Sequence, residues 1–510
     1  MKTKYFLIII LSLSITKFIF CQVNQAWLAI YDGPAGIYDE GHSLAVDTSG
    51  NVYVACRAGF GNSGKFSILK YNQLGTLEWS LLQGIESSYA QANDIVIDNS
   101  GFIYATGTAG INQNFLDILT IKFNSSGSVI WSRNYHLAND DDLAYKMKMD
   151  KQNNVYIIGG CYDSSNIFNI VTIKYDQNGN LLWSGKSVFQ GGHPEFLGIG
   201  VFNDSNIYVT GGSYPNSKLI KYNSAGQEIW SKLFLGRSKA LAVDSNENII
   251  VAGHYNKFLV RKFNKDGDSI WYSLLGGASG EAHDVLIDKE NNACVTGNSG
   301  GEYLTVKLDP SGELIWNGVS NTGDPFSISR SIAKDTSDNI YVTGELWSTF
   351  SRYGTFKYNS SGSRVWSQYF NLINSCYANK VVADNKGNVY VTGRVLIGNG
   401  GFNVGTIKYS QIVDVNEISN EFIYSYQLLQ NYPNPFNPIT KITFYLLHSA
   451  NVNLIVYDML GIEVKSIVKG DLSMGRHEFD FDGSNFASGV YYYKLFSDNF
   501  KETKKMILLK

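Results

Sequence analysis

Tryptophan recurs at a nearly constant interval through most of the chain, and this repeat constrains the fold more than any other feature. The gaps between successive members are 52, 52, 52, 47, 41, 45 and 50 residues, so eight of the nine tryptophans share one register. They are Trp27, Trp79, Trp131, Trp183, Trp230, Trp271, Trp316 and Trp366. A period of about 40 to 50 residues is typical of repeat architectures in which each unit is one supersecondary element.

Each unit contains four short segments rich in Val, Ile, Tyr and Thr. In the second unit they are DIVID, FIYATG, LTIKF and VIWS, which we name strands a, b, c and d. The a–b turn carries an acid, at Asp47, Asp98, Asp150, Asp244, Asp288, Asp335 and Asp384, with Asn203 or Asp204 in the fourth unit, where one residue is missing. The c–d turn carries a glycine, at Gly75, Gly127, Gly179, Gly226, Gly267, Gly312 and Gly362. These turns predict a four-stranded antiparallel meander, the size of one propeller blade.

The two ends of the repeat region predict how the ring closes. The chain enters on a d-type segment, 26-AWLAIY-31, and the last unit ends on strand c, 404-VGTIKYS-410. Pairing these two segments would leave no unpaired edge. We therefore predict an all-β, eight-bladed β-propeller over residues 22–410, whose last blade is completed by the N-terminal strand. A seven-bladed ring with an irregular extra unit is the alternative.

The unit A-x-x-I-x-x-D-x-x-G-N-[IV]-Y-V-T-G…T-x-K-Y-N-x-x-G-x-x-x-W resembles the SBBP repeats of bacterial secreted β-propellers. This resemblance implies the fold and no particular activity. The G-x-x-x-W ending is also similar to the repeats of pyrroloquinoline-quinone dehydrogenases, but the adjacent cysteine pair of many such enzymes is absent. No cofactor is expected.

The first 21 residues have the pattern of an export signal. Lys2 and Lys4 precede a largely apolar run from Tyr5 to Ile15, which is too short to cross a bilayer but suits a signal peptide. No later segment has 18 consecutive apolar residues, so no transmembrane segment is expected. The formal charge of −3 argues against nucleic acid as a partner. We expect a protein that is secreted or attached to the outer-membrane surface after export to the periplasm.

Composition changes after Ser410. Residues 411–425 are polar and predict a linker, and residues 426–510 predict a small immunoglobulin-like β-sandwich with strands at 440–447, 451–457, 462–468, 477–481, 489–496 and 501–509. The motifs 432-YPNPFNP-438, 456-VYDMLGIEV-464 and 486-FASGVYYYKL-495 closely resemble the type A C-terminal sorting domain of the type IX secretion system. The resemblance implies recognition of residues 426–510 by the outer-membrane translocon. Its motif residues here are Tyr432, Pro433, Asn434, Pro435, Phe436, Asn437, Pro438, Gly489 and Tyr491.

One face of the predicted ring is the expected binding surface. The a–b and c–d turns are uniform, whereas the b–c and d–a connections vary in length and should emerge together on the other face. Five residues before the repeat acid, where strand a leaves that variable face, stands a mixed polar set: His42, Asn93, Tyr145, Lys239, His283, Arg330 and Asn379. Trp347, out of register in a b–c loop, can stack on a sugar or anchor a protein, or pack under its own loop. A glycan or protein ligand is the expected partner, and a solvated rim without a ligand is the alternative.

Reactive side chains form no recognisable catalytic or metal motif. Cys56, Cys161, Cys294 and Cys376 allow disulfides after export, but buried or unpaired thiols are favoured. Asp140, Asp141 and Asp142 predict a solvated acidic loop, because calcium-loop spacing is absent, and no metal is expected. A lysine in strand c of every unit predicts a structural pairing with the repeat acids. We expect a binding or scaffold propeller, with a polysaccharide-active hydrolase or lyase as the alternative.

Overall fold

The computed structural model describes residues 23–411 and 427–510, apart from short gaps at 35–37, 60–63, 84–88, 111–114, 138–140, 163–166, 190–195, 214, 373–374, 398–400, 447–449, 473–474 and 498–499. The chain divides into two compact units, Met1–Glu417 and Ile418–Lys510. The predicted export signal at 1–21 lies outside the described residues, as does almost all of the predicted linker. No helix among the described residues is long and apolar enough to span a membrane.

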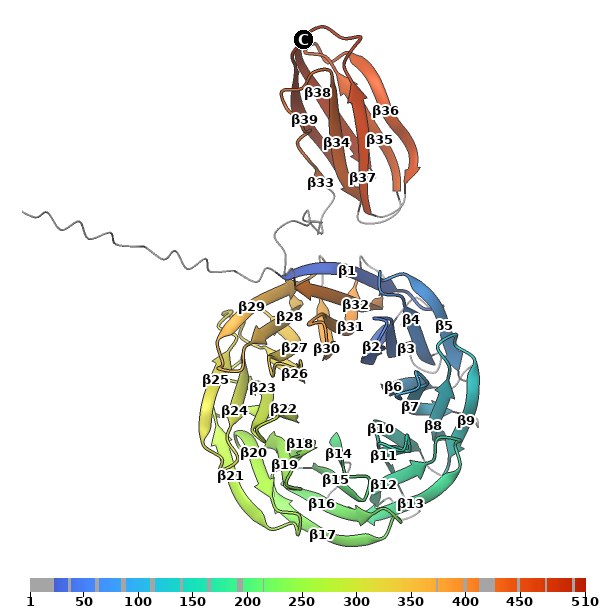
Figure 1. The fold of residues 1–510 in the computed structure, drawn as a ribbon, viewed down its shortest axis with the longest axis vertical. Helices are drawn as coiled ribbons and strands as arrows, with labels where there is room; N and C mark the ends of the chain where they lie inside the picture. The colour runs from blue at the N-terminus through green and yellow to red at the C-terminus, as the bar shows by residue number, and fades with distance from the viewer. Residues whose placement is uncertain are drawn as a thin grey trace, which may run out of the picture. The chain divides into compact units, whose positions relative to one another are not determined.

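The first unit is a ring of eight four-stranded antiparallel sheets, the predicted blades (Figure 1). The seven-bladed alternative is therefore wrong. Strand a of each blade is innermost: β2 Asp39–Val46, β6 Ala90–Ile97, β10 Asp142–Met149, β14 Phe196–Phe202, β18 Arg237–Val243, β22 Glu281–Ile287, β26 Ile328–Lys334 and β30 Cys376–Ala383. Strand b follows: β3 Val52–Ala58, β7 Ile103–Gly110, β11 Val155–Tyr162, β15 Asn206–Ser213, β19 Ile249–His254, β23 Ala293–Ser299, β27 Ile340–Trp347 and β31 Val389–Leu396.

The outer half of each blade is formed by strands c and d. Strand c is β4 Lys65–Tyr71, β8 Leu116–Phe123, β12 Phe168–Tyr175, β16 Asn216–Asn223, β20 Phe258–Phe263, β24 Glu302–Leu308, β28 Ser351–Tyr358 and β32 Phe402–Gln411. Strand d is β5 Leu77–Gln83, β9 Val129–Tyr135, β13 Leu181–Val188, β17 Glu228–Leu235, β21 Ser269–Leu275, β25 Leu314–Val319, β29 Arg364–Phe370 and, in blade eight, β1 Val23–Tyr31.

The N-terminal strand closes the ring as predicted. β1 pairs antiparallel with β32, from Val23 opposite Gln411 to Tyr31 opposite Val404, and completes the sheet β1-β32-β31-β30 (blue beside orange in Figure 1). The inward side of β1 is buried at Val23, Trp27 and Ala29. The two ends of the repeat region are thus joined by hydrogen bonds, and the closed ring has no open strand edge at this seam.

The recurring tryptophan fastens each blade to the next one. Trp27 Nε1 donates to the carbonyl oxygen of Gln73, in the c–d turn of blade one, at 3.0 Å, and equivalent bonds run from Trp79, Trp131, Trp183, Trp230, Trp271 and Trp316. The glycine of that turn lies under the indole. A Cβ on Gly75 would stand 2.6 Å from the Trp27 ring, and its φ of +82° also favours glycine. The tryptophan and the glycine therefore recur together because each junction needs both.

The seam is the one junction that differs. Trp366, on β29, faces blade eight, which has no c–d turn because its fourth strand is β1. Its Nε1 is buried, and no acceptor among the described residues reaches it. Gln411 takes over part of the turn's role, since its Oε1 accepts from Lys357 Nζ at 2.8 Å and its Nε2 donates to the carbonyl of Gly387 at 2.9 Å.

The repeat acids and the strand-c lysines are structural, as predicted. Asp98 accepts backbone N–H groups of Ser100 and Phe102 at 2.9 Å, and Asp150, Asp244, Asp288, Asp335 and Asp384 cap their turns in the same way. Lys307 Nζ lies 2.7 Å from Asp288, and Lys262 Nζ lies 3.0 Å from Asp244, which confirms the predicted pairing in these blades. The pairing does not hold in every blade, because Lys70 pairs with Glu78 and Lys221 pairs with Glu247. Cys56, Cys161, Cys294 and Cys376 are buried and form no disulfide with one another, which confirms the favoured interpretation.

The second unit is a small β-sandwich. One sheet has the order β33 Gln427–Leu428, β34 Ile439–Leu446 and β37 Gly475–Asp482, and the other has β36 Glu463–Leu472, β35 Ala450–Tyr457, β38 Gly489–Ser497 and β39 Phe500–Leu508. Its core contains Phe436, Phe444, Tyr493 and Leu508. The predicted strands are confirmed to within a few residues.

The proline-rich entry is ordered, with its apolar residue inside. Phe436 is buried against Phe481, and its backbone N–H donates to Ile507 O at 2.9 Å. Tyr432 is 81% exposed, and Pro433, Pro435 and Asn437 are exposed as well, whereas Asn434 and Pro438 are half-buried. Gly489 begins β38, and Tyr491 is buried with its hydroxyl donating to Ala487 O at 2.8 Å.

Candidate functional site

A β-bulge occurs at the same place on the inner strand of seven blades. The pairing register shifts between Gly41 and Ser43 in blade one, and at the equivalent residues of blades two, three, five, six, seven and eight. The bulged residues are those that the sequence singled out: His42, Asn93, Tyr145, Lys239, His283, Arg330 and Asn379. In blade four, β14 and β15 pair without a shift, so the residue missing from that unit is the bulge itself.

The glycine that ends strand b makes room for the bulge. A Cβ on Gly107 would stand 2.0 Å from Gln91 O on strand a, and Gly159, Gly253, Gly297, Gly344 and Gly393 face the same obstruction at 1.9 to 2.3 Å. In blade one the pair is Gly41 on strand a and Cys56 on strand b. The bulge re-aims the side chains near the start of strand a. In six of the seven bulged blades this position of strand b is therefore a glycine.

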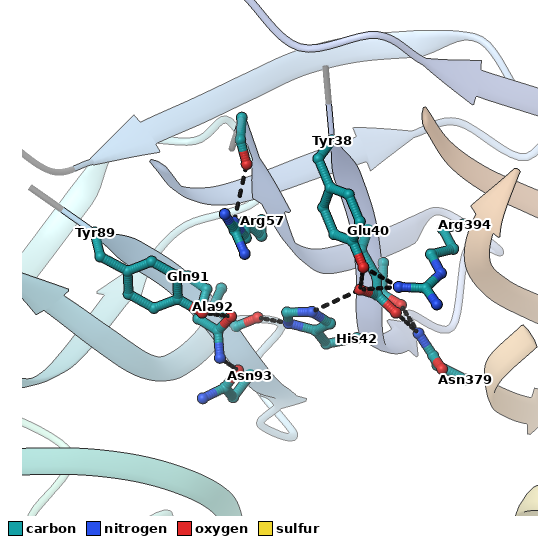
Figure 2. Close-up of polar contacts among 12 residues, drawn as sticks. Tyr38, Glu40, His42, Arg57, Tyr89, Gln91, Ala92, Asn93, Asn379 and Arg394 are labelled. Carbon is teal, nitrogen blue, oxygen red and sulfur yellow. Dashed lines mark hydrogen bonds and ion pairs between the residues drawn. The ribbon is translucent and has the colours of Figure 1, made fainter. Parts of the chain in front are cut away.

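The first group of rim residues lies on blades eight, one and two, and we name it the Glu40 cluster: Tyr38, Glu40, His42, Arg57, Asn379 and Arg394 (Figure 2). Glu40 is its centre, with Asn379 Nδ2 at 2.9 Å, Arg394 Nη1 at 3.2 Å and His42 Nε2 at 4.0 Å. His42 Nδ1 lies 2.8 Å from Ala92 O, so this nitrogen carries a proton and donates to the carbonyl.

Arginine and aromatic side chains alternate across this cluster. The Arg394 guanidinium lies 4.3 Å from the Tyr377 ring centre, 4.8 Å from that of Phe402 and 5.4 Å from that of Tyr38. Arg57 lies 4.8 Å from the Tyr89 ring centre and 5.4 Å from that of Tyr38. All of these side chains are partly exposed. Rings held by flanking guanidinium groups form a preorganised stacking surface.

The second group lies on blades five and six, and we name it the Glu281 cluster: Arg237, Lys239, Glu281, His283 and Asn298. Glu281 pairs with Arg237 and, at 2.8 Å, with Lys239. His283 Nε2 lies 3.0 Å from Asn298 Oδ1, while its Nδ1 lies 3.4 Å from Lys239 Nζ. Nε2 therefore carries the proton of a neutral imidazole, and Nδ1 accepts from the lysine.

Burial sets the charges in the Glu281 cluster. It lowers the pKa of His283 to about 3, with Lys239 adding to the effect, so this imidazole is neutral at physiological pH. It also lowers the pKa of Lys239 to about 8, although Glu281 opposes the shift. Lys239 is therefore still mostly an ammonium group at neutral pH, but it releases its proton more readily than an ordinary lysine, and it lies beside a neutral imidazole that can accept a proton.

The residue after the bulge of blade three, Lys146, lies near the ring axis. Burial lowers the pKa of Lys146, and the charges that act on it include Asp284, Lys380 and Asp94, from three other blades, and Lys148 of its own strand. Side chains of blades so far apart in the chain affect one ammonium group because they share the central axis. The candidate surface thus surrounds an axis that carries two acids and two lysines.

The sequence-predicted rim residues form two groups rather than one continuous ring. His42 and Asn379 meet at Glu40, and Lys239 meets His283, whereas Arg330 pairs with Glu345 at 3.0 Å. Asn93 donates to Ala144 O at 2.6 Å, and Tyr145 packs on the apolar core of blades three and four. Sequence reasoning missed Glu40, Glu281 and Arg237, which stand two residues before a bulge, and Arg394 and Asn298, which follow the strand-b glycine. Reading those two registers as well would have found them.

Trp347 is an exposed aromatic at the end of β27. It is 45% exposed and meets the edge of Phe326, whose own exposure is 68%. Phe350, in the adjoining b–c turn, is 54% exposed. Burial under its own loop is therefore wrong for Trp347, and blade seven presents three apolar rings to solvent.

The neutral imidazole of His283 predicts an acid-sensitive fold. Between about pH 6.5 and pH 3 the unfolded chain binds a proton that the folded chain does not, so stability is lost as pH falls through this window. From about pH 7 to pH 4.5, wild type should lose about 2 to 3 kcal/mol more than the H283Q variant. Urea unfolding at several pH values measures this difference. Plots of unfolding free energy against pH that run parallel for wild type and H283Q would contradict it.

Comparisons with known proteins agree with this architecture. A family model described as a secretion system C-terminal sorting domain matches residues 430–509, and the SBBP β-propeller repeat model matches residues 78–115. A search of curated proteins finds no match.

Solved structures share the fold at low identity. Sqt1 of Chaetomium thermophilum, solved with the N-terminus of ribosomal protein L10, has a TM-score of 0.52 at 9% identity over 76% of this chain and 100% of that chain. PorZ, a surface component of the type IX secretion system of Porphyromonas gingivalis, has a TM-score of 0.32 at 13% identity over 92% and 74%. Virginiamycin B lyase of Staphylococcus aureus has a TM-score of 0.39 at 11% identity over 77% and 100%. The similarities to PorZ and to the lyase, with TM-scores below 0.5, imply nothing about the function of this chain.

The repeat units, the closed ring and the terminal β-sandwich lead to one assignment. The sorting domain implies secretion across the outer membrane. The chain is an eight-bladed β-propeller that carries an SBBP β-propeller repeat at residues 78–115 and a type IX secretion system C-terminal sorting domain at residues 430–509.

Proposed function

We propose that this protein is a secreted or surface-attached binding propeller whose variable face holds an anionic polysaccharide. The observation that carries the proposal is the alternation of arginine and aromatic side chains in the Glu40 cluster. Aromatic rings stack on sugar rings, and guanidinium groups bind carboxylates in a planar, two-pronged geometry.

The charge of the rim supports an acidic ligand. The Glu40 and Glu281 clusters together contain four arginine or lysine side chains, Arg57, Arg394, Arg237 and Lys239, against two glutamates. These two clusters therefore carry a local excess of cationic side chains in a chain whose formal charge is −3. Exposed rings of Trp347, Phe326 and Phe350 extend the stacking surface onto blade seven.

A polysaccharide panel assayed for both binding and depolymerisation tests the proposal. Uronate-rich polymers should bind more tightly than neutral ones, and binding should weaken as salt is raised. Replacing one stacking ring, as in W347A, should weaken binding about tenfold or more, as loss of an interface aromatic does. The matched control is Y272A, which removes a ring that is 59% exposed on outer strand β21. Equal affinity for neutral and acidic polymers, or an equal effect of both substitutions, would contradict the proposal.

A second candidate function is a polysaccharide hydrolase or lyase, in which Lys239 and His283, 3.4 Å apart, would supply the proton-transfer groups. Product formation that disappears in H283Q while binding persists would favour the enzyme. If wild type shows no turnover and the double variant H283Q/R330Q loses binding, the binding module is favoured. If the double variant binds as wild type does, the Glu281 side of the rim takes no part in binding.

A further inference from the structure

Two buried carboxylates and one imidazole converge between blades two and three, away from both rim clusters. Asp117 is the second residue of β8, His136 follows β9 directly, and Asp142 is the first residue of β10. One ligand atom from each lies within 4.8 Å of the other two. His136 Nδ1 stands 2.9 Å from Asp117 Oδ1 and 3.7 Å from Asp142 Oδ2. All three residues adjoin b–c or d–a connections and therefore lie on the variable face.

Asp142 has one carboxylate oxygen that accepts no hydrogen bond from the described residues. It is fully buried, and Asp117 is 4% exposed. The Leu137 backbone N–H donates to Asp142 Oδ2 at 2.7 Å, but Oδ1 has no hydrogen-bond partner among the described residues. The neighbouring Cys161 thiol is only a weak donor. A buried carboxylate oxygen without a donor is costly unless a cation meets it.

The charge balance points the same way. His136 is the ion-pair partner of both carboxylates among the described residues, and its side chain is 42% exposed. Two buried negative charges therefore share one partly solvated partner. The expectation of a solvated acidic loop is wrong for Asp142.

We propose that Asp117, His136 and Asp142 bind a divalent transition-metal ion such as Zn²⁺. Ligand atoms about 2.1 Å from a tetrahedral ion lie about 3.4 Å apart, and the two nitrogen–oxygen distances bracket this value. An imidazole in the set favours zinc over calcium or magnesium, which prefer oxygen ligands. Three protein ligands leave a fourth position, open toward the variable face, for water or a ligand group.

Metal binding to the full mature chain, first stripped with a chelator, tests the proposal. One equivalent of Zn²⁺ should remain bound after dialysis and should raise the thermal unfolding midpoint. D142N, D117N and H136Q should each weaken Zn²⁺ binding by more than the roughly 10- to 100-fold that loss of an outer-shell partner costs. Without metal, D142N should be at least as stable as wild type, because it removes like-charge repulsion.

Asp39 offers a matched control. It is the first residue of β2, as Asp142 is of β10, and it is equally buried, but its carboxylate accepts the backbone N–H groups of Gly33 at 2.5 Å and Gly59 at 2.7 Å. D39N should bind Zn²⁺ like wild type. The assignment is overturned if wild type binds no Zn²⁺ at micromolar concentration, if Ca²⁺ is preferred, or if H136Q and D142N still bind Zn²⁺ with wild-type affinity. If metal-free D142N is markedly less stable than wild type, the three residues form a stabilising ion pair and not a metal site.

Discussion

Removing residues 427–510 should abolish appearance of the propeller outside the cell while leaving it folded within. The sorting-domain match covers 430–509, and these residues form a compact unit with its own apolar core, so their loss removes no contact described within a blade. The expected result is accumulation of the truncated chain in the periplasm, measured by cell fractionation and immunoblotting. Near-complete loss of the extracellular pool is the largest effect we predict.

Point variants separate loss of recognition from loss of folding. Tyr432 is exposed, so Y432A should leave the β-sandwich folded and reduce secretion if the translocon contacts this surface. F436A removes a buried core ring and should destabilise the β-sandwich by about 3 to 5 kcal/mol. The full-length W347A variant, changed on the propeller alone, should be secreted normally. Secretion of the truncated chain at the wild-type level would refute the role of the sorting domain.

Removing residues 23–31 should prevent the ring from folding as a cooperative unit. These residues are β1, and their loss exposes the whole edge of β32 and deprives blade eight of its outer strand. Domains are stable by about 5 to 15 kcal/mol, and losing one strand of a closed ring removes several buried side chains at once. The expected outcome is aggregation through the exposed β32 edge. Size-exclusion chromatography measures the aggregation, and circular dichroism measures the loss of cooperative unfolding.

Two substitutions on β1 provide a graded version of this test. Trp27 is 6% exposed, contacts Tyr71 and Tyr390, and donates to Gln73 O, so W27A should cost about 3 to 5 kcal/mol in unfolding free energy. Ile30, on the same strand, is 37% exposed, and I30A should cost well under half of that. Equal destabilisation by both, or a monodisperse and cooperatively unfolding deletion variant, would show that β1 is dispensable for closure.

Much of the fold follows from local signals that the repeat multiplies. An Asp capping its own turn and a Gly under the next blade's indole each act over a few residues, and their recurrence predicts eight similar blades. The missing d strand of the last unit and the surplus one at the N-terminus then predict the closure between β1 and β32. The register of the rim was predictable as well, because a bulge adds one residue at a constant place in the repeat.

The composition of the candidate sites was less accessible. Glu40 and Arg394 meet across the seam although they are distant in the chain, and the two repeat registers that they occupy do not show that they are partners. Asp142 reads as part of an acidic run with Asp140 and Asp141, but its close partners are Asp117 and His136, from the preceding blade. Asp141, just before the strand, instead accepts the Leu116 backbone N–H at 2.8 Å, so these two neighbouring acids have different surroundings.

The sequence by itself determined the blade count, the ring closure, the sorting domain and the face that varies, because periodic spacing and turn chemistry are local properties. The tertiary structure alone decided which side chains from different blades meet, and hence where Glu40, Glu281 and Asp142 find their partners. Burial then set the protonation of His283 and Lys239, since an imidazole or a lysine changes its pKa in this way only once the folded ring removes it from water.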